Sequence, residues 1–199
     1  MKKRILCFGD SNTYGYDPRS YLGGRYPEDS RWPSILSAMP EWDTLNLGEN
    51  GREIPCRPPA LSYALEIFSR CMPWDAAVIM LGGNDLLQHS SFTAEDVTCR
   101  METFLRSLLI HLGQDFSGKL VLVSPPPMAP GAWVQEARLL TQSARLGACY
   151  SDLARRLSLG FVDAAPWQVP LTFDGVHFSP EGHAAFARML SRSLRPLLL

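Results

Sequence analysis

Residues 4–13 read RILCFGDSNT, and this stretch decides the fold. Its first half, 4–8, is a short apolar run without polar alternation, which indicates a strand covered on both faces. Gly9-Asp10-Ser11 follows at once, and such residues end strands and begin helices. The sequence therefore predicts a buried N-terminal strand that turns directly into a helix.

The same pattern recurs along the chain. Further apolar runs, each read as a strand, span residues 44–47, 76–81, 120–123 and 160–162. Helical segments are expected at 59–70, from an N-cap at Thr93, at 135–157, and after Ser179-Pro180-Glu181. Alternating strands and helices predict a three-layer α/β/α fold with a parallel sheet. No repeat or linker divides the chain, so one domain over residues 1–199 is expected.

Composition narrows the classes of protein that fit. The 199 residues are 46% apolar and 20% charged, with a net charge of −1. This balance fits a globular protein and argues against nucleic acid or an anionic membrane as a partner. The first apolar run is too short for a signal peptide, and no run approaches the ~18 residues of a membrane span.

The five cysteines are scattered and odd in number. They form no CxxC pair and no zinc-binding pattern with histidine, so neither disulfides nor a metal are expected. A reduced cytoplasmic protein is the simplest interpretation, with Cys7 as a small core residue.

Ser11 is the first candidate for chemistry. A serine at a strand-to-helix turn can present its hydroxyl outward, and its backbone N–H can face a bound oxyanion. The alternative is that the Asp10-Ser11 turn only caps the helix.

Asp174 and His177 form the second candidate, immediately before the last helix. Three residues apart in a turn, the carboxylate can orient the imidazole while the other ring nitrogen faces a nucleophile. A histidine near its ordinary pKa is a suitable base at neutral pH. The alternative is a solvated surface turn.

Two glycine loops complete the set. Gly82-Gly83-Asn84-Asp85 follows the third strand, and Asn84 can donate from its amide to an anion. The loop 46–51 follows the second strand, and Gly51 offers an unobstructed N–H. Each alone could be a plain turn. Together with Ser11 and His177, they supply the groups that acyl transfer needs, each at the carboxyl end of a strand.

These four motifs, in this order, resemble those of the SGNH (GDSL) hydrolase superfamily, over residues 4–183. The resemblance implies a flavodoxin-like parallel sheet of about five strands and no metal or organic cofactor. It implies Ser11 as nucleophile, His177 as base and Asp174 as its partner. The implied oxyanion donors are the N–H groups of Ser11 and Gly51 and the side-chain amide of Asn84.

A closer likeness is to the arylesterase/acyltransferase branch. It rests on residues 3–11 (KRILCFGDS), 30–32 (SRW), 123–127 (VSPPP) and 174–178 (DGVHF). Members of that branch hydrolyse short-chain and aryl esters, and some transfer acyl groups to alcohols. Asn12 replaces an aliphatic residue of many relatives, which predicts a more polar pocket floor. The segment 127–136 is shorter than in oligomeric members, so acyl transfer and a ring-like homo-oligomer stay open.

The resulting prediction is a serine esterase that hydrolyses small, short-acyl or aryl, carboxylic esters through an acyl-enzyme on Ser11. Expected substrate contacts are the side chains Asn12, Tyr14, Tyr16, Trp133 and Phe178, with core packing as the alternative for Phe178. His89 is a further candidate for the cleft, whereas His111 and His183 are expected at the surface.

Two other functions stay open. A carbohydrate O-acetyl esterase would use the same catalytic set, and polar loop residues such as Asn12 and Arg52-Glu53 are compatible with it. A non-catalytic binding module on the same fold is the alternative from another class. Competent residue types at every reacting position argue against that module.

Overall fold

The sheet of the computed structural model, which describes residues 1–20 and 22–199, has five parallel strands. They are β1 (Lys3–Gly9), β2 (Trp42–Gly48), β3 (Ala76–Met80), β4 (Leu120–Ser124) and β5 (Gly160–Asp163), in the spatial order β2-β1-β3-β4-β5. Every apolar run expected to be a strand is one, with ends that shift by a residue or two. The predicted α/β/α fold is confirmed.

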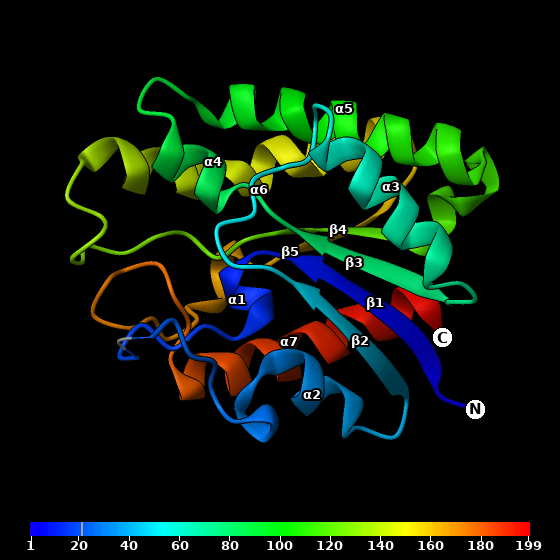
Figure 1. Ribbon diagram of the computed structural model, residues 1–199, viewed down its shortest axis with the longest axis horizontal. Coiled ribbons are helices and arrows are strands. Elements are labelled where there is room, and N and C mark those ends of the chain that lie inside the picture. The colour runs from blue at the N-terminus through cyan, green and yellow to red at the C-terminus, as the bar shows by residue number, and fades with distance from the viewer. Residues whose placement is uncertain (21) are drawn as a thin grey trace.

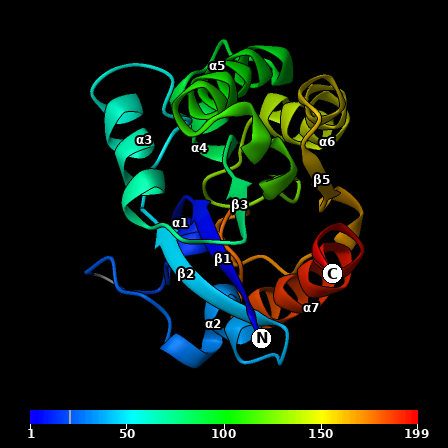
Figure 2. The same cartoon turned by 90° about the vertical axis from the view of Figure 1, so that its right-hand side faces the viewer.

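Helices cover both faces of the sheet (Figures 1 and 2). One layer contains α3 (Ala60–Arg70), α4 (Gly83–Gln88), α5 (Ala94–Leu112) and α6 (Ala137–Leu157). The other contains α2 (Trp32–Ser37) and α7 (Pro180–Leu198), and the short α1 (Ser11–Tyr14) follows β1 directly. Short 3₁₀ helices occupy Glu28–Ser30, Gln114–Lys119 and Ala165–Trp167.

Local capping explains where the long helices begin. The Thr93 hydroxyl accepts from the amide of Asp96, whose carboxylate accepts from the Thr93 amide, so the two residues form a capping box. The Ser179 hydroxyl likewise accepts from the amide of Gly182, with Pro180 in the first turn of the helix. Both predicted N-caps are confirmed.

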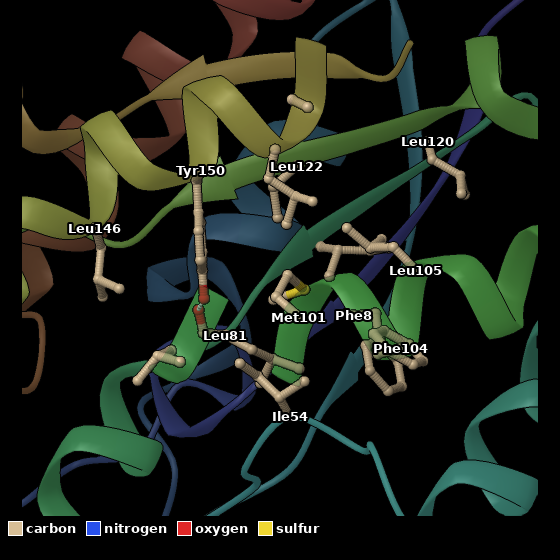
Figure 3. Close-up of a cluster of buried hydrophobic side chains, with 14 of the residues drawn as sticks. Phe8, Ile54, Leu81, Met101, Phe104, Leu105, Leu120, Leu122, Leu146 and Tyr150 are labelled. Atoms are coloured by element: carbon tan, nitrogen blue, oxygen red, sulfur yellow. Dashed lines mark hydrogen bonds between the residues drawn. The ribbon is translucent and has the colours of Figure 1, made fainter. Parts of the chain in front are cut away.

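The strands bury side chains on both faces. Phe8 joins the apolar layer beneath α3–α6, together with Phe104 and Tyr150 (Figure 3). Cys7, its neighbour in β1, is fully buried in the opposite layer with Trp32 under α2 and α7. The core position expected for Cys7 is therefore confirmed, and burial on both faces explains why the strand sequences show no polar alternation.

The strand order determines where the sequence motifs meet. Because β1 lies between β2 and β3, the loops that follow these three strands emerge side by side at one edge of the sheet. These are the loops that carry Ser11, Gly51 and Asn84. Among the described residues, no helix is long and apolar enough to cross a membrane.

Candidate active site

The turn from β1 into α1 places Ser11 at the edge of the sheet. Asp10 caps α1, and its carboxylate accepts from the Asn12 amide at 3.0 Å. A side chain at Gly9 would come within 2.1 Å of the Thr13 hydroxyl and 2.9 Å of the Met80 carbonyl, so only glycine fits there. Ser11 is the first residue of the helix and is 7% exposed.

Ser11, His177 and Asp174 form a continuous hydrogen-bonded line. His177 Nε2 lies 3.0 Å from Ser11 Oγ, and His177 Nδ1 lies 2.7 Å from Asp174 Oδ2. Asp174 and His177 are near each other in the sequence, and the fold brings them to a serine that lies 166 residues away from the histidine. Both side chains are buried, which excludes the solvated surface turn.

The other oxygen of Asp174 holds the loop. Asp174 Oδ1 accepts from the Thr172 hydroxyl and from the amides of Val176 and His177, at 2.8–2.9 Å. Burial alone would raise the pKa of Asp174, but the hydrogen bonds from His177 and Val176 outweigh it and lower that pKa to about 2. The carboxylate is therefore ionised at neutral pH. It favours the tautomer with the proton on Nδ1, which leaves Nε2 free to accept the serine proton.

Two candidate oxyanion donors face the same cleft as Ser11. Asn84 lies in the first turn of α4, and one hydrogen of its side-chain amide donates to the Arg52 carbonyl at 3.1 Å. The second hydrogen of that amide is available to a ligand. Gly51 has a φ of 71°, which favours glycine, and a Cβ there would meet nothing within 4 Å.

The cleft has a volume of about 260 Å³, and both aromatic and polar side chains line it. It is lined by Ser11, Tyr16, Asn50, Gly51, Asn84, Gln88, Trp133 and His177. The rings of Tyr16 and Trp133 flank the imidazole of His177, with centroids 4.7 and 5.0 Å away. Trp133 is 51% exposed and forms the outer rim.

Sequence reasoning missed two polar residues of the cleft, Asn50 and Gln88. Asn50 stands beside Gly51 in the predicted loop, so its neighbourhood could have suggested it. Gln88 is exposed at the last position of α4, a helix that the sequence does not predict, and nothing in the sequence singles it out.

Of the residues expected to contact substrate, Tyr14 and Phe178 lie away from the cleft, whereas Asn12 borders a small separate cavity on the other side of Ser11. The Asn12 side chain donates to the Val176 carbonyl at 3.1 Å and accepts from the Phe178 amide at 2.8 Å, so it ties the serine turn to the histidine loop. Tyr14 packs under the guanidinium of Arg25, at 4.0 Å, and is absent from the cleft lining. Phe178 is 1% exposed and packs against Phe186, which corrects its placement in the substrate wall.

The remaining histidines also differ from one another. His89 Nε2 lies 2.8 Å from a Glu53 carboxylate oxygen and does not line the cleft. His111 is exposed, as expected. His183 was expected at the surface but is fully buried, and burial lowers its pKa to about 4. Hydropathy alone could not show this, because the packing of Tyr26 and Phe178 around its ring is non-local.

Within the described part of the chain, no group of three or more His, Cys, Asp or Glu side chains is arranged to hold a metal ion. The groups that line the site are a hydroxyl, an imidazole, a carboxylate and N–H donors. This set can deprotonate a serine and stabilise a negative oxygen in front of it.

The chain is similar to several proteins of known structure. The chain is similar to an aryl esterase from M. smegmatis, with 28% identity, a TM-score of 0.82 and coverage of 98% of this chain and 100% of that one. It is also similar to a carbohydrate acetylesterase family member from Sinorhizobium meliloti, with 29% identity, a TM-score of 0.83 and coverage of 100% and 99%.

A lipase/acylhydrolase from Enterococcus faecalis, at 22% identity, shares the fold, with a TM-score of 0.70 over 100% of this chain and 98% of that one. Among curated proteins, none matches the sequence significantly. The sequence profile of the GDSL-like lipase/acylhydrolase family matches residues 7–185. The chain therefore belongs to the GDSL-like lipase/acylhydrolase family.

Proposed function

We propose that this protein is a serine esterase that hydrolyses small carboxylic esters, with Ser11 as its nucleophile. The observation that carries the proposal is the line from Ser11 through His177 to Asp174, which opens into a cleft that Gly51 and Asn84 also line. Membership of an acylhydrolase family and likeness to two structures described as esterases support it.

The geometry supports a two-step reaction. His177 Nε2 takes the proton of Ser11 as Oγ attacks the ester carbonyl carbon. The carbonyl oxygen becomes an oxyanion and accepts hydrogen bonds from the N–H groups of Ser11 and Gly51 and from the Asn84 amide. His177 then returns the proton to the departing alkoxide. Water repeats the sequence on the acyl-enzyme, which releases the acid and restores Ser11.

The position of His177 assigns the two sides of the substrate. The leaving oxygen has to reach His177 Nε2, so the alcohol part occupies the cleft beside Tyr16 and Trp133. The acyl part then points away from His177. On that side Ser11 and Asn84 border a separate cavity of about 20 Å³.

This cavity accounts for a preference for short acyl groups. Its lining includes Pro126, Met128 and Leu146, and its volume holds about one water-sized group, which is the size of an acetyl methyl. We therefore propose acetyl and similarly short esters as substrates.

The Met128 side chain offers a test of this assignment. Truncation in Met128→Ala should enlarge the cavity and raise the ratio of kcat/KM for p-nitrophenyl butyrate over acetate by about tenfold or more, as a hydrophobic pocket discriminates single methylenes by ~10–200-fold. Met39→Ala is the matched control, since Met39 packs in the layer under α2 and α7. An unchanged ratio in folded Met128→Ala protein would place the acyl group elsewhere.

A carbohydrate O-acetyl esterase is the second candidate. The specific observation in its favour is that two carboxamides, Asn50 and Gln88, share the alcohol side of the cleft with the ring of Trp133. Carboxamides bind hydroxyl groups, and an exposed aromatic ring packs against the apolar face of a sugar.

One panel of substrates separates these functions. We expect hydrolysis of p-nitrophenyl acetate by the wild-type chain, loss of activity in Ser11→Ala, and labelling of Ser11 by a fluorophosphonate. Acetylated sugars cleaved far faster than aryl acetates would favour the second candidate. If the folded protein neither hydrolyses these esters nor is labelled at Ser11, the result would favour a non-catalytic binding module.

The state of the cysteines supports a location. All five thiols are free, and Cys7 is buried where no partner can reach it. Free thiols persist in reducing compartments, and we therefore propose the cytoplasm.

A further inference from the structure

The segment Arg52–Ile54 directly follows Gly51 and belongs to no helix or strand. The Arg52 amide donates within the loop, to the Glu49 carbonyl at 3.3 Å, and further hydrogen bonds reach the segment from α4. The Arg52 carbonyl accepts from the Asn84 side chain at 3.1 Å, and the Ile54 amide donates to Asp85 Oδ2 at 3.1 Å. Two consecutive residues of α4 thus hold the backbone that carries the Gly51 amide.

Arg100 of α5 extends this attachment. Its Nε lies 2.8 Å from Asp85 Oδ1, without the alignment of a hydrogen bond, so the contact is an ion pair. Its Nη2 donates to a Glu53 carboxylate oxygen at 2.9 Å and to the Ile54 carbonyl at 3.4 Å. The guanidinium therefore joins α4, α5 and the segment after Gly51.

The burial of this ion pair calls for an explanation. Asp85 is fully buried, and the Arg100 side chain is 22% exposed. Removing two charges from water is costly, and buried ion pairs rarely stabilise a fold more than apolar residues of the same volume would. Ile54 already packs with Met101 and Phe104 in the apolar layer (Figure 3), so the segment has a hydrophobic anchor.

Apolar packing does not define the orientation of a peptide plane as directional polar contacts do. Gly51 depends on such contacts, because a Cβ there would contact nothing within 4 Å and the hydrogen bond that closes its turn, from the Arg52 amide to the Glu49 carbonyl, is 3.3 Å long. An oxyanion donor has to lie within a few tenths of an ångström of its place to be effective.

We propose that the Asp85–Arg100 ion pair is a positioning device for the oxyanion donors Gly51 and Asn84, an inference that rests on the proposed function. Asp85 anchors the amide of Ile54 to α4 through one carboxylate oxygen, and Arg100 holds the other oxygen through its Nε. Neither residue touches substrate.

The first test is Asp85→Asn, which preserves shape and removes the charge. We expect kcat on p-nitrophenyl acetate to fall about 10- to 100-fold with KM changed less than about threefold, since loss of a whole oxyanion donor costs ~10²–10³ in kcat. Arg100→Met should behave alike, and Arg100→Lys should recover part of the loss. Arg106→Met is the matched control on α5, because Arg106 pairs with Glu102 at the surface.

A double-mutant cycle separates positioning from general stability. In an Asn84→Ala background one donor is already absent, so Asp85→Asn should reduce kcat at least threefold less than in the wild-type background. An equal reduction in both backgrounds, or wild-type kcat in folded Asp85→Asn protein, would overturn the proposal. If Asp85→Asn does not fold, Arg100→Lys takes its place in the same cycle. An equal reduction of kcat in both backgrounds, or wild-type kcat in folded Arg100→Lys protein, would then overturn the proposal.

Failure of the proposed function and failure of the positioning role give different results. Wild-type protein without esterase activity, or with full activity in Ser11→Ala, would contradict the function itself. Wild-type activity that depends on Ser11 but not on Asp85 or Arg100 would contradict only the positioning role.

Discussion

Asn84 has two tasks that a single amide group can perform together. One N–H holds the Arg52 carbonyl at 3.1 Å, and the other is available to the oxyanion. Because its fixed orientation costs nothing during the reaction, its contribution should be large.

Asn84→Ala should therefore lower kcat by ~10²–10³ and leave KM nearly unchanged. Ser11→Ala should lose more, because it removes the attacking oxygen. Initial rates on p-nitrophenyl acetate, with circular dichroism as a check of folding, measure both. Full kcat in folded Asn84→Ala protein would remove Asn84 from the oxyanion site.

Single residues also show the limit of prediction from the sequence. The motifs of Ser11, Asn84 and His177 could be recognised, because the reactive groups of these residue types lie in their side chains. Asn12 could not be assigned in this way, because its partners at Val176 and Phe178 lie 164 and 166 residues away. A polar side chain looks the same in sequence whether it binds substrate or a distant backbone.

At the scale of elements, two loops are joined into one support for His177, the proposed base. The amides of Ala129, Ala132 and Trp133 donate to the carbonyls of Gly175, Phe173 and Asp174 at 3.0–3.1 Å. The loop that carries Trp133 therefore lies directly on the loop that carries Asp174. A side chain at Gly131 would come within 2.4 Å of the Asp174 backbone.

Gly131→Ala should separate these loops. We expect a lower Tm and a lower kcat, because the added methyl displaces the backbone of Asp174 and with it the base. Gly118→Ala is the matched control, since a Cβ there meets nothing within 4 Å. Thermal melts and kcat for both variants test this. Equal behaviour of the two would show that the close approach is easily relieved.

Prediction of elements succeeded where the local signal was strong. Apolar runs identified all five strands, and N-caps identified α5 and α7. The short helix α4 is not predicted by the sequence, because Gly82-Gly83-Asn84-Asp85 contains turn-forming residues and the helix has only 6 residues. Its stability comes from contacts outside it, such as those of Asp85 with Ile54 and Arg100, which no local pattern encodes.

For the whole molecule, two buried ionisable groups, Asp10 and His183, give the free energy of unfolding opposing responses to acid. Burial raises the pKa of Asp10 to about 6, against an ordinary value of 3.8. Burial lowers the pKa of His183 to about 4, against an ordinary value of 6.5. Between pH 6 and 4 the folded chain therefore binds more protons at Asp10 than the unfolded chain, and fewer at His183.

The signs follow from proton linkage. As the pH falls from 6.5 toward 4, His183 takes its proton in the unfolded chain first, and this lowers the free energy of unfolding by up to about 1.4 kcal/mol per pH unit. Asp10 takes its proton in the folded chain first, so it raises the free energy of unfolding as the pH falls from 6 to 4. Below pH 4 the free energy of unfolding falls again with acid. Asp174, whose pKa is lowered to about 2, takes its proton in the unfolded chain before it does so in the folded chain. The two buried groups should nearly cancel in the wild-type chain, which predicts a shallow pH dependence between 6 and 4.

Removing either group should reveal the other. His183→Gln should make the free energy of unfolding rise as the pH falls from 6 to 4.5, and Asp10→Asn should make it fall more steeply than in the wild type. Urea unfolding at three pH values in this range measures both slopes, with the exposed His111→Gln as control. Parallel curves for wild type and His183→Gln would mean that His183 is protonated alike in both states. In that event its burial would not exclude the proton, and His183 would contribute nothing to the acid response of the fold.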